Sequence, residues 1–174
     1  MSTARFQYCL TIVLGHEGGY VDHKNDRGGK TMKGVTQKVY DDFCRVTGRE
    51  AQPVKDITMV EVELIYGGYW KDGHCSYMPE PLDLLMFDAS VNHGPGRAAK
   101  ILQRVLGITE DGVIGKQTMQ ALHEDVVATS IDDVCHRYLD ERAHFFDRII
   151  ERDPSQAVFA KGWMNRVDHL RELV

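Results

Sequence analysis

The stretch Gly15-His16-Glu17-Gly18-Gly19-Tyr20 follows a segment, residues 6–14, whose apolar side chains recur at the three- and four-residue steps of a helix. Glu17 lies eleven residues after Phe6, close to three full turns, so the pattern places it on the apolar face. The pair Gly18-Gly19 is typical of a helix end. Glu17 is therefore expected to point inward at the negative end of a helix dipole. Both features favour the protonated form that a general acid needs.

The Gly-rich segment after Glu17 carries a second group of candidate residues. Asp26 lies nine residues after Glu17, and the turn between them allows the loop to bring the two carboxyls face to face. Cleavage of a glycosidic bond uses such a pair, one protonated and one ionised, and a polar loop favours the ionised form of Asp26. Thr31 offers a hydroxyl to hold a nucleophilic water. The alternative interpretation makes Asp26 a turn residue and Thr31 a strand residue.

Composition limits the possible functions. The chain has 174 residues, 43% hydrophobic and 27% charged, as in a globular protein of one domain or of two small domains sharing a core. Its net charge of −5 argues against nucleic acid as a partner, because phosphates require a basic surface. No apolar run approaches the roughly 20 residues of a membrane span. The cysteines lack the paired spacing of zinc sites, which predicts reduced, buried thiols at Cys9, Cys44, Cys75 and Cys135.

Helical spacing of apolar residues recurs along most of the chain. It predicts further helices over residues 36–46, 58–70, 82–91, 97–106, 118–122, 131–149 and 157–173. Thr58 and Glu61 form a capping-box pattern, and Asp88 lies within the most apolar helix as a candidate buried charge, typically a cap or an ion pair. Short extended pieces at residues 30–32 and 35–36 predict a small β-hairpin. The fold class is therefore mainly α, with one small β-hairpin after the first helix.

Two other groups of side chains have competing interpretations. Several aromatic residues are candidates for stacking on sugar rings, although core packing is the commoner role: Tyr20, Tyr66, Tyr69, Trp70 and Trp163. A metal site could be built on His16, Asp22 and His23. This alternative lacks a His-Glu-x-x-His motif, and the adjacent Gly-Gly pair prevents ligands from being presented one helical turn apart. We expect neither a metal nor a cofactor.

These motifs carry a resemblance to a known family. The first block resembles the signature of glycoside hydrolase family 108, the N-acetylmuramidases of phage endolysins and bacterial secretion loci: His16-Glu17-Gly18-Gly19-Tyr20, Asp26, Gly28-Gly29, Thr31 and Gly34-Val35-Thr36. The order Glu, Asp, Thr is also similar to the triad of phage-type lysozymes. Later blocks resemble the same family at Tyr69-Trp70, Phe87-Asp88, Val91-Asn92-His93-Gly94-Pro95 and Lys161-Gly162-Trp163. Residues 106–107 and 111–115 look like its peptidoglycan-associated segment.

The resemblance implies a lysozyme-like helical fold, with a muramidase catalytic region at residues 1–95 and a helical peptidoglycan-associated region at 96–174 packed on it. It implies hydrolysis of the β-1,4 bond between N-acetylmuramic acid and N-acetylglucosamine in peptidoglycan glycan strands, for cell lysis or wall editing. Glu17 would be the catalytic acid. On the spacing argument, Asp26 helped by Thr31 would stabilise the oxocarbenium-like state or position water. The expected substrate-binding residues are Tyr20, Trp70, Asn92 and Trp163.

Two alternatives from other classes remain open. One is a non-catalytic peptidoglycan-binding module, favoured by residues 111–115, and the other is a metal-dependent cell-wall peptidase. Without a recognisable signal peptide or membrane span, we expect synthesis in the cytoplasm, no stable membrane insertion, and action on peptidoglycan in the periplasm or cell wall. A holin or other export helper would then be needed. The sequence leaves open whether a phage lysis cassette or a bacterial secretion system uses the protein.

Overall fold

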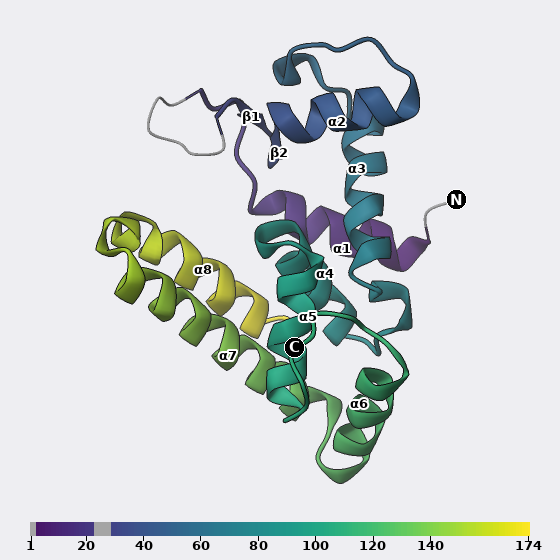
Figure 1. Ribbon diagram of the computed structural model, residues 1–174, viewed down its shortest axis with the longest axis vertical. Coiled ribbons are helices and arrows are strands. Elements are labelled where there is room, and N and C mark those ends of the chain that lie inside the picture. The colour runs from purple at the N-terminus through teal and green to yellow at the C-terminus, as the bar shows by residue number, and fades with distance from the viewer. Residues whose placement is uncertain (1–2, 23–28) are drawn as a thin grey trace. The chain divides into compact units, whose positions relative to one another are not determined.

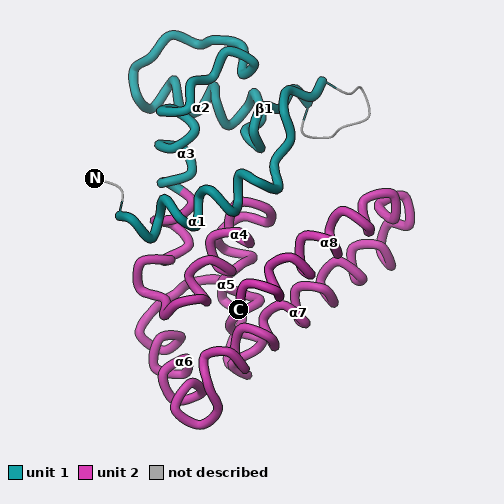
Figure 2. The backbone as a smooth tube through the Cα atoms, turned by 180° about the vertical axis from the view of Figure 1, so that it is seen from behind, with its two compact units in different colours: residues 1–68 teal, residues 69–174 magenta. Residues whose placement is uncertain are grey.

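The computed structural model describes residues 3–22 and 29–174, and the chain forms two compact units, residues 1–68 and 69–174 (Figures 1 and 2). Nearly all regular structure is helical, and the described strands form a single two-stranded antiparallel hairpin. The predicted fold class, mainly α with a small hairpin after the first helix, is confirmed. No helix in the described part of the chain has the length and apolar character needed to cross a membrane.

The first unit contains α1 (Ala4–Gly15), β1 (Thr31–Met32), β2 (Val35–Thr36), α2 (Gln37–Thr47), the 3₁₀ helix η1 (Val54–Asp56) and most of α3 (Met59–Asp72), within which the boundary between the units falls. The apolar face of α1 is buried through Phe6, Cys9, Leu10 and Val13, as its spacing predicts. The expectation that this helix runs through Glu17 up to the Gly18-Gly19 pair is wrong by two residues. The helix ends at Gly15, because the N–H of His16 already turns back to the carbonyls of Val13 and Leu14.

Local signals fix the ends of α2 and the start of α3. Gly48 follows α2 with φ +67°, the left-handed conformation that favours glycine at a helix end. Before α3, Glu61 Oε2 accepts hydrogen bonds from the N–H (2.9 Å) and hydroxyl (2.8 Å) of Thr58, while the Glu61 N–H donates to Thr58 Oγ1 at 3.3 Å. The capping box therefore forms as predicted. The hydrogen bond from the Thr58 N–H lowers the pKa of Glu61 by more than burial raises it. The hydrogen bond from Arg49 lowers this pKa further.

The hairpin turns tightly. Thr31 pairs with Thr36 and Met32 pairs with Val35, and the two residues between the strands, Lys33 and Gly34, both have positive φ, 49° and 74°. This is the backbone pattern of a two-residue hairpin loop whose twist matches that of its strands. The turn consequently brings the backbone of Gly34 to a defined position.

The second unit is a bundle of helices around α4 (Leu82–His93), which is buried along nearly its whole length. It also contains η2 (Cys75–Tyr77), α5 (Pro95–Val105), α6 (Lys116–Ala128), α7 (Ile131–Arg152), η3 (Pro154–Phe159) and α8 (Ala160–Arg171). Helix α4 packs on α5 and α7, and α7 runs beside α8 (Figure 1). The four cysteines of the chain are free thiols and all are buried, as expected.

A buried charge cluster joins three helices of this unit. Asp88 of α4 is fully buried and pairs with Arg142 of α7 at 2.6 Å and with Arg166 of α8 at 2.8 Å. Burial alone would raise the pKa of Asp88, but the two guanidinium groups outweigh it and hold this pKa at about 2. Arg142 Nε also donates to His93 Nε2 at 3.2 Å. The interpretation of Asp88 as a buried paired charge is therefore correct.

Candidate active site

The backbone places Glu17 just beyond the C-terminal end of α1, where its N–H still donates to the carbonyl of Leu14 at 3.1 Å. This last turn fixes the direction in which the chain leaves the helix. The Glu17 side chain is partly exposed. The expected position at the negative end of the helix is therefore present, although the residue follows the helix instead of lying within it.

The Glu17 carboxyl lies against the hairpin turn. A Cβ placed on Gly34 would stand 2.7 Å from Glu17 Oε2 and 2.8 Å from its Cδ, and it would also collide with the hydroxyl of Tyr66. Both side chains therefore converge on the same backbone position, where glycine is favoured for steric as well as conformational reasons. The Tyr66 hydroxyl donates to the carbonyl of Lys33 at 2.9 Å and so holds this turn to α3. The carboxyl thus lies in a site built from α1, the hairpin and α3.

Other predicted residues of the first unit lie on the same hairpin or near it. Thr31 is half-buried in β1, and its hydroxyl donates to the carbonyl of Gly29 at 3.1 Å, while its backbone pairs with Val21. Tyr20 is 44% exposed, and its ring is accessible to a ligand. Asp26, the predicted ionised carboxylate, lies outside the described residues, as does His23 of the metal alternative. Their roles remain predictions.

The remaining predicted substrate-binding residues belong to the second unit. Trp70 is only 8% exposed, with its indole N–H donating to Ser76 Oγ at 2.7 Å and its ring edge on Phe87. It therefore packs as a core residue, and stacking on a sugar would require the ring to be uncovered. Asn92 is exposed at the end of α4. Trp163 is half-buried on α8, with its ring stacked on that of Phe146 at 4.7 Å. Their binding roles stay predictions.

Sequence reasoning missed the function of Tyr66 in this site. Its ring was a candidate for sugar stacking, yet the side chain is fully buried and contributes its hydroxyl to the turn beside Glu17. A signal was available, because Tyr66 falls four residues after Val62 on the buried face of α3, where a hydroxyl needs a partner.

Across residues 3–22 and 29–174, no cluster of three His, Cys, Asp or Glu side chains is arranged to hold a metal ion.

Comparison with known proteins identifies the class to which this chain belongs. Residues 10–94 match the family model described as Glycosyl hydrolase 108, and residues 97–168 match a second model, described as a predicted peptidoglycan domain. The solved structure of Brucella abortus SagA is similar to this chain at 30% sequence identity, with a TM-score of 0.81 and coverage of 98% of this chain and 94% of SagA. No curated protein matches the chain.

The chain therefore belongs to the glycosyl hydrolase 108 family, which confirms the resemblance drawn from the motifs. Its glycoside hydrolase region contains Glu17, Gly34 and Tyr66, and a predicted peptidoglycan domain follows it. The expected boundary at residue 95, between a catalytic region and a peptidoglycan-associated region, stays a prediction.

Proposed function

We propose that this protein hydrolyses the β-1,4 bond between N-acetylmuramic acid and N-acetylglucosamine in peptidoglycan, with Glu17 as the general acid. The observation that carries the proposal is the position of the Glu17 carboxyl, fixed against Gly34 and beside the Tyr66 hydroxyl within the glycoside hydrolase region. A carboxyl held in this way can protonate the glycosidic oxygen as the bond to the muramic acid C1 breaks. The predicted peptidoglycan domain supports peptidoglycan as the polymer.

A second group must complete the reaction. We assign this role to Asp26, which would face the oxocarbenium-like state or accept a proton from the attacking water, with Thr31 holding that water. The water oxygen then bonds to C1, and the Glu17 proton ends on O4 of the departing N-acetylglucosamine. A water between carboxylate and sugar corresponds to the wider carboxyl separation of inverting enzymes. The α-anomer should therefore form first, and proton NMR of the fresh product distinguishes it from the β-anomer that retention would give.

The identity of the cleaved bond is tested by digesting purified peptidoglycan, reducing the products with borohydride and identifying the new reducing ends by mass spectrometry. Reduced muramic acid is the expected result. Reduced glucosamine would instead make the protein a glucosaminidase. Free amines without new reducing ends would make it a peptidase, and retained binding without any released fragment would make it a binding module.

A further inference from the structure

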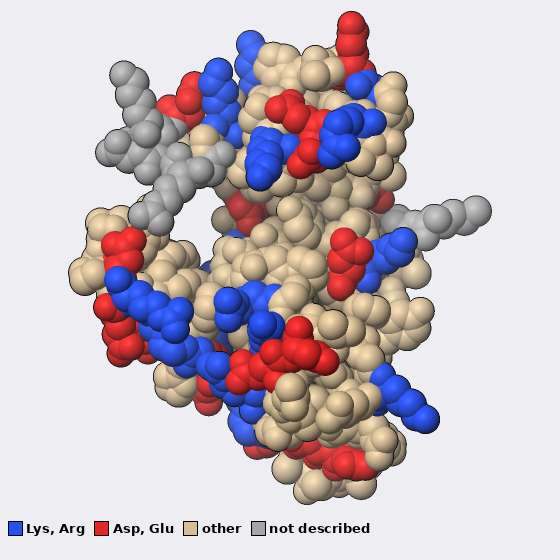
Figure 3. Space-filling model, viewed as in Figure 1, with Lys and Arg blue, Asp and Glu red and all other residues tan. Residues whose placement is uncertain are grey.

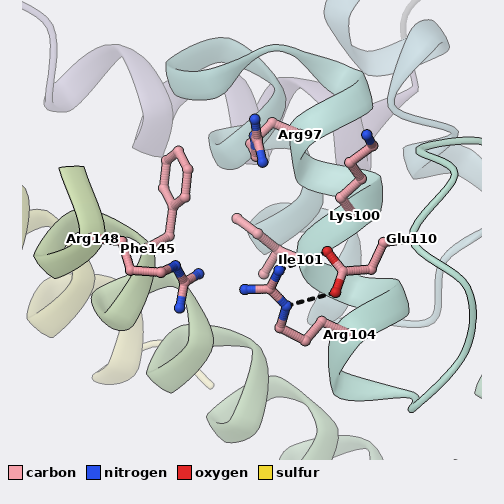
Figure 4. Close-up of a pocket in the computed structure, with 7 residues that line it drawn as sticks. All are labelled: Arg97, Lys100, Ile101, Arg104, Glu110, Phe145 and Arg148. Atoms are coloured by element: carbon pink, nitrogen blue, oxygen red, sulfur yellow. Dashed lines mark hydrogen bonds and ion pairs between the residues drawn. The ribbon is translucent and has the colours of Figure 1, made fainter. Parts of the chain in front are cut away.

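Helices α5 and α7 of the second unit border a small, shallow hollow on the protein surface (Figure 4). Four cationic side chains line it together with one apolar, one aromatic and one acidic residue: Arg97, Lys100, Ile101, Arg104, Glu110, Phe145 and Arg148. Figure 3 shows Lys and Arg side chains over these two helices, with Asp and Glu side chains beside them. Because the whole chain has a net charge of −5, this local excess of positive charge is not a consequence of overall composition.

Two of the four cations are neutralised by carboxylates. Arg104 donates to both oxygens of Glu110, at 2.7 and 2.8 Å, and to Glu141 at 2.8 Å. Arg148 also donates to Glu141, at 2.7 Å. A bidentate arginine–carboxylate pair has a fixed geometry, so Arg104 and Glu110 give one side of the hollow a defined shape.

The other two cations form no ion pair among the described residues, although Lys100 is attracted at longer range to Glu110 and Asp111. The guanidinium of Arg97 lies over the ring of Phe145, 5.1 Å from its centroid, and the Lys100 stem packs closely on Gly112. The hydrogen bonds from Arg104 are the main cause of the lowered pKa of Glu110. The more distant charge of Lys100 lowers this pKa further. Two like charges three residues apart on one helix face repel each other, and a shared anion would relieve this.

The chemistry of peptidoglycan indicates which anion this is. Its N-acetylated sugars are uncharged, and the lactyl carboxyl of muramic acid is used in the amide bond to the stem peptide, whereas the stem peptide itself carries free carboxylates. Every residue lining the hollow falls within residues 97–168, the segment matched by the predicted peptidoglycan domain. We propose that the hollow binds a stem-peptide carboxylate through Arg97 and Lys100, with Phe145 contacting the aliphatic part of the peptide. This inference rests on the proposed function, since it takes peptidoglycan as the polymer.

The test measures binding of the synthetic tripeptide L-Ala-γ-D-Glu-diaminopimelate to the full-length protein by calorimetry at low salt. The expected result is that the free-acid tripeptide binds at least about tenfold more tightly than its carboxamide form, because charge-assisted bonds are lost on amidation. Binding should also weaken at high salt. The variant Arg97→Gln/Lys100→Gln should lose about tenfold in affinity. Lys71→Gln/Lys116→Gln removes the same charge from exposed positions outside the hollow and should bind as the wild type does.

Equal binding of the acid and amide forms, an unaffected Arg97→Gln/Lys100→Gln variant, or no binding by the wild type would overturn the inference. Hydrolysis is measured separately on glycan strands from which an amidase has removed the peptides. Both double variants should release new reducing ends from these strands as fast as the wild type. Failure of all proteins on both stripped strands and intact peptidoglycan, with tripeptide binding as expected, would reject the proposed hydrolysis alone. Normal hydrolysis without tripeptide binding would reject the carboxylate site alone.

Discussion

The α-carbon of Gly34 lies against the carboxyl of Glu17, so closely that a methyl group there would stand 2.7 Å from Oε2. The hairpin turn is thus one wall of the site, and the absence of a side chain at residue 34 is what allows the acid to occupy its position. Any larger residue must displace either the turn or the carboxyl. Gly34 is in this sense a positioning residue for Glu17.

The substitution Gly34→Ala should therefore reduce turnover by about a hundredfold, because a shift of about 1 Å at a reacting group costs that much. It should also cost about 1 to 2 kcal/mol of stability, since residue 34 has φ +74°. Gly48→Ala is the matched control, with φ +67° and no atom within 4 Å of the added methyl. It shares the backbone strain without the collision. Similar activity losses per folded molecule in both variants would show that strain, and not the contact with Glu17, is responsible.

Removal of the Tyr66 hydroxyl should loosen the turn without opening a large cavity. Tyr66→Phe leaves the Lys33 carbonyl without its 2.9 Å bond, so we expect a stability loss of about 1 kcal/mol and turnover reduced by about tenfold. Tyr8→Phe, at a position 50% exposed on α1, is the control and should change neither quantity. Denaturant unfolding and reducing-end assays supply the measurements. Unchanged turnover in Tyr66→Phe would show that Tyr66 contributes to packing and not to the position of Glu17.

The buried cluster of the second unit predicts acid sensitivity. His93 accepts a hydrogen bond from Arg142 through Nε2, which requires an unprotonated nitrogen, and burial followed by the charge of Arg142 lowers the pKa of His93 to about 3. Because the unfolded histidine has its ordinary pKa of about 6.5, protonation between these values favours the unfolded state. Stability should therefore fall as the pH falls through this range, by about 2 kcal/mol between pH 7 and pH 5.

This pH dependence is measured by denaturant unfolding at a series of pH values. His93→Gln should flatten the curve between pH 7 and pH 5, whereas His136→Gln, at an exposed position, should leave it unchanged. Below pH 4 a further loss is expected in both, because Asp88 has its pKa lowered to about 2 and its charge is lost only in strong acid. If the stability of His93→Gln fell with pH as steeply as that of the wild type, groups other than His93 would be responsible for the acid sensitivity.

The second carboxylate can be tested through the proposed role of Asp26. Asp26→Asn should reduce turnover by at least about a hundredfold, because the positive charge that develops on the sugar would then have no opposing carboxylate. Its melting temperature should stay near the wild-type value. Asp56→Asn, an exposed substitution in the same unit, controls for the loss of one negative charge and should remain active. A large stability loss in Asp26→Asn with full activity per folded molecule would make Asp26 a turn residue only.

The parts of the fold that follow local rules could be predicted from the sequence. The capping box of Thr58 and Glu61 and the helix end at Gly48 depend on residues a few positions apart, and both form as expected. The burial of α4 follows from its apolar composition, and with it the need of Asp88 for buried partners. The identity of those partners, Arg142 and Arg166, could not be predicted, because they come from helices far along the chain.

The candidate site was predicted only in part, for the same reason. The motif identified Glu17, but its contact with Gly34 and its proximity to Tyr66 arise from tertiary packing of three elements. The end of α1 at Gly15 was also missed, since the Gly18-Gly19 pair gave the stronger stop signal. Trp70 was assigned to sugar binding from its residue type, whereas its burial depends on its neighbours in the second unit.

The central claim is that Glu17 supplies the proton for glycosidic cleavage. It is tested most directly by comparing the rates at which Glu17→Gln and wild-type protein release new reducing ends from purified peptidoglycan, with Glu50→Gln as the exposed control in the same unit. Glutamine keeps the size of the side chain but has no acidic proton to give. We predict a rate at least about a hundredfold lower for Glu17→Gln at an unchanged melting temperature, and a wild-type rate for Glu50→Gln. Near wild-type release by a folded Glu17→Gln protein would contradict this role of Glu17.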